Sequence, residues 1–269
     1  MPKRPDRFKN VEIKETPTRK PRAKRSLGQN FLTALWPVRT MAKAADIQQG
    51  DIVIEIGPGK GILTKELLYS GAHVIAVEKD DALYVALLEK FAEEITSKKL
   101  TLILGDILEQ DISKITKHAP YKVVANIPYN ITGLLIPFFL ESSTQPISIT
   151  FLVQKEVANR ICARDDKESI LSLSVKVFGA PEYVEKVSRS LFRPAPNVDS
   201  AIIHIKNIHP GFTDESQKIQ FFETIKKAFN SRRKKISSTL KGIPLPENLK
   251  DKRPEELSVQ DFLQIITLH

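Results

Sequence analysis

The sequence is poor in several features that mark common protein classes. Its 269 residues include one cysteine, Cys162, so no internal disulfide can form, which is typical of a reducing compartment. The five histidines are scattered without ligand spacing, and we expect no bound metal. No run of 18 or more apolar residues occurs, so we expect no membrane span. The basic N-terminal segment lacks the apolar stretch of a secretory signal, and we expect a cytoplasmic protein.

Positive charge, in contrast, is abundant and unevenly placed. The net charge is +9, and residues 1–25 alone carry +7 from ten Lys and Arg against three acids. A second basic segment, residues 224–245, contains seven Lys and Arg and no acid. Two basic segments around a near-neutral middle suggest a polyanionic partner. A solvated surface next to a disordered tail explains the same charges, so charge alone leaves the choice open.

The chain divides into three segments by its pattern. Residues 1–24 are polar, contain prolines and lack apolar periodicity, which predicts a disordered basic tail. Residues 25–209 alternate strand-length apolar runs with stretches of helical period, which predicts an α/β fold with a mostly parallel sheet covered on both faces. Residues 210–269 have helical, amphipathic stretches over 215–240 and 254–268 and no strand pattern, which predicts a small C-terminal all-α domain.

The expected strands and helices can be given by residue range. The strands are 52–56, 73–78, 100–104, 121–126 and 147–153, and the helices lie near 61–70, 80–95 and 132–142. Two further strand-like runs, 183–190 and 200–206, flank a proline-rich turn at 193–197. That arrangement predicts a hairpin at the edge of the sheet.

A glycine-rich turn, EIGPGKG at residues 55–61, follows the first expected strand. Glycines between a strand and a helix let the backbone approach a ligand closely, although a plain tight turn has the same pattern. Glu78 ends the second strand, where a carboxylate can bind both ribose hydroxyls of a nucleotide, and Asp106 follows the third. Either acid alone also fits a helix cap. Because the carboxyl ends of parallel strands meet at one edge of a sheet, the three signals together predict a cofactor site.

The composition of this site favours S-adenosylmethionine. The dinucleotide fingerprint is G-x-G-x-x-G, and here the third glycine comes one residue early. Glu55 is unsuited to a pyrophosphate but suits an ammonium group, either directly or by holding the loop. S-adenosylmethionine combines an ammonium, a sulfonium, a ribose and an adenine, which fits an acid-rimmed pocket better than NAD does. We therefore place Glu55, Gly57, Gly59, Glu78 and Asp106 at this cofactor.

The segment Asn126-Ile127-Pro128-Tyr129 follows the fourth expected strand. It fits an ordinary turn, but beside a sulfonium it has a chemical interpretation. The Asn126 side-chain oxygen and the Ile127 carbonyl would accept both N–H bonds of an adenine amine and aim its lone pair at the methyl carbon. Pro128 leaves the preceding carbonyl free, and Tyr129 would stack on an extruded base. Phe192 is either the other wall of the base pocket or a core aromatic.

Together these residues resemble the small-subunit ribosomal RNA adenine N6,N6-dimethyltransferase family of bacterial type. The matching segments are LGQNFL at 27–32, EIGPGKG at 55–61, GD at 105–106, NIPYN at 126–130, FRPAPNVDSA at 192–201 and AFNSRRKK at 228–235. The resemblance covers roughly residues 22–268. It implies a Rossmann-like class I methyltransferase sheet with an antiparallel last strand. It also implies cofactor contacts from Gln29, Asn30, Leu32, Gly57, Glu78, Asp106 and Asn126.

The same resemblance implies a substrate and partners. The product would be two methyl groups on each of two adjacent adenines in the 3′-terminal hairpin of small-subunit rRNA, made late in assembly on an immature subunit. We expect a monomer, with a basic helix over 228–235. The expected RNA contacts are Lys226, Arg232, Arg233, Lys234 and Lys235. The basic tail is longer than is usual in the family, and we expect it to strengthen electrostatic contact with rRNA.

Three other interpretations remain. A large-subunit rRNA adenine methyltransferase of the antibiotic-resistance type shares the QNF and NIPY elements, although residues 198–201 and 228–235 favour the small-subunit group. A non-catalytic RNA-binding assembly or transcription factor with this fold is the second, and the intact Glu78, Asp106 and Asn126 argue against it. A DNA adenine methyltransferase is the third, disfavoured because such enzymes usually place proline where this chain has Ile127.

Overall fold

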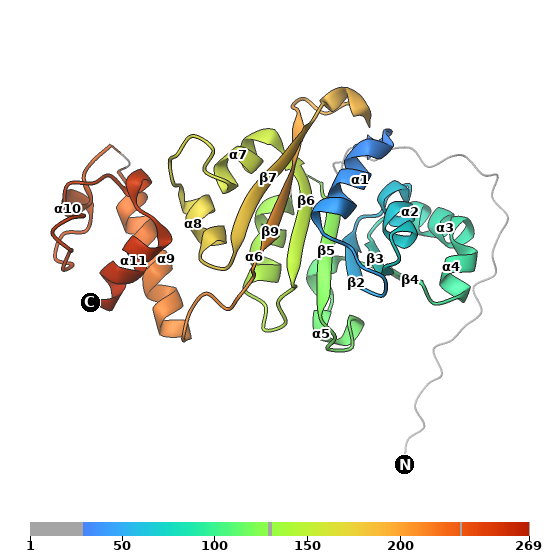
Figure 1. Ribbon diagram of the computed structural model, residues 1–269, viewed down its shortest axis with the longest axis horizontal. Coiled ribbons are helices and arrows are strands. Elements are labelled where there is room, and N and C mark those ends of the chain that lie inside the picture. The colour runs from blue at the N-terminus through green and yellow to red at the C-terminus, as the bar shows by residue number, and fades with distance from the viewer. Residues whose placement is uncertain (1–28, 129–130, 232, 269) are drawn as a thin grey trace, which may run out of the picture.

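A seven-stranded sheet forms the centre of the protein (Figure 1), in a computed structural model that describes residues 29–128, 131–231 and 233–268. The strand order is β4-β3-β2-β5-β6-β9-β7. The strands are β2 (Ile52–Ile56), β3 (His73–Glu78), β4 (Leu100–Leu104), β5 (Tyr121–Asn126), β6 (Ser148–Gln154), β7 (Ala180–Val187) and β9 (Ser200–Lys206). The expected tail at 1–24 lies outside the described residues, as do Tyr129 and Arg232.

The sheet is parallel except at one strand. Strands β4, β3, β2, β5 and β6 pair in parallel, while β9 pairs antiparallel with both β6 and β7. The Rossmann-like α/β fold with an antiparallel last strand is therefore confirmed. The hairpin of β7 and β9 is also present, with β7 at the edge, although its connection is longer than a turn. It contains the short helix η4 (Arg189–Leu191) and a two-residue strand, β8 (Phe192–Arg193).

Both faces of the sheet are covered by helices, because successive strand residues point to opposite sides. On one face, Val53, Val74 and Val124 pack under α1 (Leu35–Ala44), α2 (Ile62–Tyr69) and α3 (Asp81–Lys90). On the other, Ile54, Val123 and Phe151 belong to a core shared with a second set of helices. These are α5 (Ile112–Ile115), α6 (Thr132–Leu140), α7 (Lys155–Ile161), α8 (Ile170–Lys176), α9 (Glu215–Phe229) and α11 (Val259–Thr267).

The helices differ from the sequence prediction at two places. The helix expected over 80–95 is divided at Phe91, whose backbone leaves the helical region, into α3 and α4 (Ala92–Thr96). The basic helix expected over 228–235 is wrong: α9 ends at Phe229, and the basic residues follow it. The fully buried Ile236 donates its backbone N–H to the carbonyl of Lys252 at 2.9 Å and begins the separate α10 (Ile236–Thr239). Tertiary packing therefore ends the helix before the basic residues 233–235, while Lys226 and Lys227 lie in its last turn.

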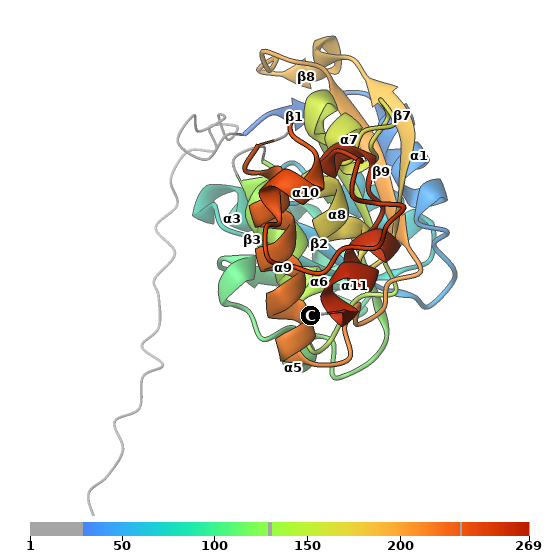
Figure 2. The same ribbon diagram turned by 90° about the vertical axis from the view of Figure 1, so that its left-hand side faces the viewer.

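The C-terminal residues contain helices and no strand among those the structure describes. Phe221, Ile225 and Phe262 are buried in the same core cluster as the face of the sheet that carries Ile54 and Val123. Figure 2 shows α9, α10 and α11 gathered at the end of the molecule nearest the viewer. Among the described residues, no helix combines the length and the apolar character that a membrane crossing requires.

Candidate active site

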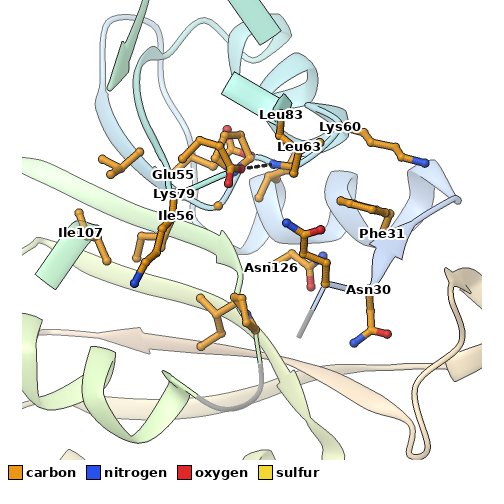
Figure 3. Close-up of a pocket in the computed structure, with 18 of the residues that line it drawn as sticks. Asn30, Phe31, Glu55, Ile56, Lys60, Leu63, Lys79, Leu83, Ile107 and Asn126 are labelled. Carbon is orange, nitrogen blue, oxygen red and sulfur yellow. Dashed lines mark hydrogen bonds between the residues drawn. The ribbon is translucent and has the colours of Figure 1, made fainter. Parts of the chain in front are cut away.

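A cavity of about 270 Å³ opens where β2, β3, β4 and β5 end. Its lining includes residues that follow each of these strands, together with the N-terminal segment 29–32 and Phe192. Side chains from four strands meet here because all four strands run in parallel and end at the same edge. In Figure 3, Glu55 and Lys79 lie on one side of the cavity, Asn30 and Phe31 on the other, and Asn126 between them.

The glycine turn after β2 forms one wall. Gly57, Gly59 and Gly61 have φ angles of 62°, 59° and 72°, in the left-handed region that favours glycine. The backbone N–H of Gly57 donates to the Val77 carbonyl at 2.9 Å, which fixes the turn against β3. A Cβ atom on Gly57 would meet nothing within 4 Å, so the cavity leaves room for a ligand close to this backbone.

Glu78, at the end of β3, is buried and faces this turn. Its Oε2 accepts the Gly59 N–H at 3.0 Å, and its Oε1 accepts the Asp80 N–H at 2.9 Å. Burial raises the pKa of the Glu78 carboxyl group above its ordinary value, against the lowering effect of these two bonds. Each carboxylate oxygen accepts more than one hydrogen bond, so acceptor capacity is left for a ribose hydroxyl.

Asp106 comes directly after β4 and makes two contacts. Its Oδ1 accepts the Leu108 N–H at 3.0 Å, and its Oδ2 binds Lys79 Nζ at 2.8 Å. The Lys79 ammonium lowers the pKa of the Asp106 carboxyl group, which keeps this carboxylate ionised at the rim of the cavity. Leu83 and Ile107 line the cavity beside it and supply apolar surface for a planar base.

Glu55 is the most buried acid of the site, with 1% of its surface exposed. Its Oε2 has no hydrogen-bond partner in the described structure, although Glu55 lines the cavity. Burial raises the pKa of Glu55 to about 8 against the lowering effect of the neighbouring Thr64, and the negative charge of Glu78 adds to the rise. A buried carboxyl oxygen without a partner indicates a place for a donor from a ligand, and a cation there would restore the ionised form.

Asn126 ends β5 and is half-buried at the same cavity. The next residue, Ile127, packs its side chain in the core with 2% exposed, and Pro128 lines the cavity. Tyr129, expected to stack on a base, lies outside the described residues. Asn126 and the glycine turn therefore share one cavity, as methyl transfer to a bound amine requires.

The N-terminal segment forms the opposite wall by pairing with the β7–β9 connection. The strand β1 (Phe31–Leu32) pairs with β8, with Phe31 opposite Arg193 and Leu32 opposite Phe192. Phe192 is 1% exposed and contributes to both the core and the cavity wall. Lys60 Nζ lies 4.6 Å from the centre of the Phe31 ring, a cation–π contact that joins this segment to the glycine turn.

The structure brings most of the predicted cofactor and acceptor residues together. All of the described ones line the cavity: Gln29, Asn30, Leu32, Glu55, Gly57, Gly59, Glu78, Asp106, Asn126, Ile127, Pro128 and Phe192. The predicted RNA-binding residues Lys226, Arg233, Lys234 and Lys235 do not line it. Four further lining residues were not predicted from the sequence: Phe31, Lys79, Leu83 and Ile107. Among them only Lys79 had a signal in the sequence, because it directly follows Glu78 at the end of an expected strand.

The residues present fit S-adenosylmethionine. The cavity offers an unpartnered buried carboxyl oxygen that suits an ammonium, open space at Gly57, the buried acid Glu78 that suits a ribose, and apolar side chains that suit an adenine. Each part of this cofactor would therefore meet a group of suitable chemistry.

Comparison with known proteins is consistent with this geometry. Residues 20–265 match the sequence model of the family described as ribosomal RNA adenine dimethylase. The chain is 40% identical over 220 residues to ribosomal RNA small subunit methyltransferase A of Dehalococcoides mccartyi, covering 81% of this chain and 75% of the relative. It is 34% identical over 264 residues to the protein of that name from Chlamydia muridarum, covering 92% of each.

Two solved structures share the fold. The 23S rRNA methyltransferase ErmE has a TM-score of 0.74 at 24% identity, covering 89% of this chain and 99% of that one. A dimethyladenosine transferase from Plasmodium falciparum also has a TM-score of 0.74 at 24% identity, covering 88% and 96%.

The fold is the Rossmann-like fold of class I methyltransferases. The match over residues 20–265 and the identity to the curated relatives make the assignment more specific. The chain belongs to the ribosomal RNA adenine dimethylase family.

Proposed function

We propose that this protein transfers methyl groups from S-adenosylmethionine to N6 of adenine in small-subunit rRNA, giving N6,N6-dimethyladenine. The observation that carries the proposal is the placement of Asn126 in the same cavity as Gly57, Glu78 and Asp106. Membership of the rRNA adenine dimethylase family and the small-subunit names of the relatives support the choice of substrate. Two adjacent adenines of the 3′-terminal hairpin are the proposed targets.

The cofactor, when bound, supplies an electrophilic methyl group on a sulfonium. Glu78 would hold the ribose through carboxylate oxygens that the Gly59 and Asp80 N–H groups already orient. Asp106, kept ionised by Lys79, would accept a hydrogen bond from the adenine part of the cofactor. Glu55 would bind the ammonium through its unpartnered oxygen, and Gln29, Asn30 and Leu32 line the cavity beside these groups.

The acceptor amine is a weak nucleophile because its lone pair is conjugated with the purine ring. Asn126 Oδ1 and the Ile127 carbonyl accept its two N–H bonds, which favours a pyramidal nitrogen and directs the lone pair toward the methyl carbon. Pro128 fixes the turn that presents this carbonyl. Phe192 forms a wall of the cavity into which the target base is extruded. No dedicated base is needed, because the methylated ammonium is acidic and loses its proton to solvent.

The rRNA contacts outside the cavity are assigned by charge. Lys226, Arg233 and Lys234 are exposed near the end of α9, and the exposed Lys235 binds Asp251 at 2.7 Å. We assign these residues, together with Arg232 and the basic tail, to rRNA phosphates. We further propose that the substrate is an immature small subunit and that the enzyme is a monomer in the cytoplasm. We also propose that the chain has two domains, a methyltransferase domain over residues 25–209 and a helical domain over residues 210–269.

The large-subunit alternative is retained as a second candidate because the fold does not separate it from the small-subunit function. ErmE, named for 23S rRNA, matches this fold as well as the dimethyladenosine transferase does, and at 24% identity both matches describe the fold alone. Because the 34–40% identical relatives have small-subunit names, we prefer the small subunit.

The test of the acceptor geometry is Asn126→Ala. Losing one oriented hydrogen bond to the reacting nitrogen should lower kcat by roughly a hundredfold to a thousandfold. Affinity for S-adenosylhomocysteine, measured by calorimetry, should change little. Asn248→Ala removes the same amide from an exposed position in the C-terminal region and serves as the control. An unchanged kcat in Asn126→Ala means that the amine is held elsewhere.

A further inference from the structure

The connection between β7 and β9 carries two arginines, Arg189 and Arg193, and Arg193 adjoins a residue of the cavity wall. We call residues 188–199 the β7–β9 tip. Within it, Phe192 lines the cavity, and its neighbour Arg193 pairs across β8 and β1 with Phe31, which also lines the cavity. Figure 2 shows β8 next to β1 at one extremity of the molecule. Because directly opposite residues of an antiparallel pair point to the same side, Arg193 lies on the same side of this strand pair as Phe31, and Arg193 is exposed.

The backbone of the tip, rather than an acid, holds both guanidinium groups. Arg193 Nη1 donates to the Ser190 and Phe192 carbonyls at 3.0 and 2.9 Å. Arg189 Nη1 donates to the Asn197 carbonyl at 3.1 Å. Both side chains are thereby held in place while each guanidinium keeps donors that these bonds do not use.

The tip leaves this positive charge unneutralised. Its acid, Asp199, binds Lys186 Nζ at 2.9 Å and accepts the Arg189 backbone N–H at 3.0 Å. Within the described part of the chain, neither the Arg189 nor the Arg193 guanidinium forms an ion pair with a carboxylate. Two fixed guanidinium groups without acidic partners are suited to an external anion.

A phosphate is the anion that the geometry fits. Arg193 uses Nη1 internally, so the edge formed by Nε and Nη2 stays available, and this edge can bind two phosphate oxygens at once. An adenosine whose base enters the cavity brings its flanking phosphates to the cavity mouth, where the tip stands. We propose that Arg193, supported by Arg189, binds the RNA phosphate that flanks the target adenosine. This proposal rests on the proposed function, since it takes RNA as the substrate.

This contact would favour the extruded nucleotide. Taking a base out of its stack costs free energy that new contacts must offset. A phosphate contact beside the cavity forms only when the backbone is turned toward it, so it stabilises the extruded state rather than RNA binding in general. Arg193 is therefore a positioning residue, whereas the basic residues after α9 bind RNA outside the cavity.

The test compares Arg193→Gln with Arg193→Lys on small ribosomal subunits that lack the methyl groups. Arg193→Gln should raise KM by about tenfold, as expected for a lost charge-assisted hydrogen bond. It should also reduce the slope of log affinity against log salt concentration by about 1, the effect of one lost phosphate contact. Arg193→Lys keeps the charge but cannot bind two phosphate oxygens through one planar group, so it should keep the salt slope and have an intermediate KM.

Two controls separate this proposal from its alternatives. Lys99→Gln removes one exposed charge just before β4, at the opposite edge of the sheet, and should leave KM and the salt slope unchanged. Affinity for S-adenosylhomocysteine should also be unchanged in Arg193→Gln. A second variant, Arg189→Gln, should shift KM in the same direction as Arg193→Gln, and it serves as the test if the latter fails to fold.

Wild-type KM and salt slope in both Gln variants would overturn the proposal. A raised KM with an unchanged salt slope would also overturn it, because the arginines would then only shape the tip. Loss of S-adenosylhomocysteine affinity in both variants would also overturn it, because the arginines would then only shape the tip and the cavity beside it. If the wild-type protein methylates no adenine in the subunit, the proposed function itself fails, which is a separate result.

Discussion

Glu55 at the end of β2 is a carboxyl group whose ionisation depends on what fills the cavity. Burial and the nearby Glu78 raise its pKa to about 8, so the ligand-free protein holds it mostly protonated at neutral pH. An ammonium beside its unpartnered Oε2 favours the ionised form. Binding of such a ligand should therefore displace a proton from Glu55.

We predict that affinity for S-adenosylhomocysteine, which carries the same ammonium group, rises between pH 6 and 7.5. The raised pKa means that the competent, ionised form of Glu55 becomes more populated as pH approaches about 8. The rise should be up to about tenfold per pH unit for one displaced proton. Calorimetry in buffers of different ionisation enthalpy should detect that proton. Glu55→Gln should bind more weakly, with a flatter pH profile, and equal profiles would contradict this role.

At the residue scale, strand-end acids and amides were the most predictable part of the site. Each of these side chains lies at or just after the end of an apolar run that predicts a parallel strand, and the structure brings them together in one cavity: Glu55, Glu78, Asp106 and Asn126. Phe31 and Leu83 were not predictable, since an apolar residue in a helix or strand has the same pattern whether it lines a cavity or the core. The bonding of Lys79 to Asp106 depends on the pairing of β3 and β4.

The glycine turn and α2 are held against α3 by close packing. Gly61 precedes α2 with a φ of 72°, and a Cβ atom there would lie 2.5 Å from Phe91 Cε2 and 3.0 Å from Leu87 Cδ2. Phe91 is 3% exposed, so its ring has little freedom to move aside. Gly50 has a φ of 88° and nothing within 4 Å of such an atom.

We predict that Gly61→Ala destabilises the protein more than Gly50→Ala does. Both substitutions place a side chain in the left-handed region, at a cost of about 1–2 kcal/mol. Gly61→Ala adds overpacking against Phe91 and Leu87, worth a further 1–3 kcal/mol or so. Urea denaturation gives both free energies of unfolding. An equal decrease in the free energy of unfolding in the two variants would contradict this prediction, because it would mean that the side chains between the turn and α3 move aside without cost.

At the element scale, strands were easier to predict than helices. The ranges of β2, β3, β4 and β5 agree with the sequence prediction, because buried parallel strands are continuous apolar runs between turns. The helices α7 and α8 were not predicted. They are short, and α8 is rich in serine and β-branched residues of modest helix propensity. The end of α9 was misplaced because a tertiary contact of Ile236, invisible in local sequence, sets it.

On the scale of the whole molecule, the fold does not specify which RNA is the substrate. A large-subunit enzyme and a dimethyladenosine transferase match this chain equally well in structure. The helices on both sheet faces followed from the sequence pattern, whereas the antiparallel β9 followed from the resemblance to the family. The continuous core joining the sheet to the C-terminal helices did not, because periodicity shows that a face is apolar without showing its partner.

The most direct measurement locates the methyl groups on ribosomal RNA. Small and large subunits from cells lacking the modification would be incubated with the purified protein and S-adenosylmethionine carrying a deuterated methyl group, and both rRNAs analysed by mass spectrometry. We predict label only in small-subunit rRNA, as N6,N6-dimethyladenine at two adjacent adenines of the 3′-terminal hairpin. Label in large-subunit rRNA, or no label from a protein that binds the cofactor, would contradict it.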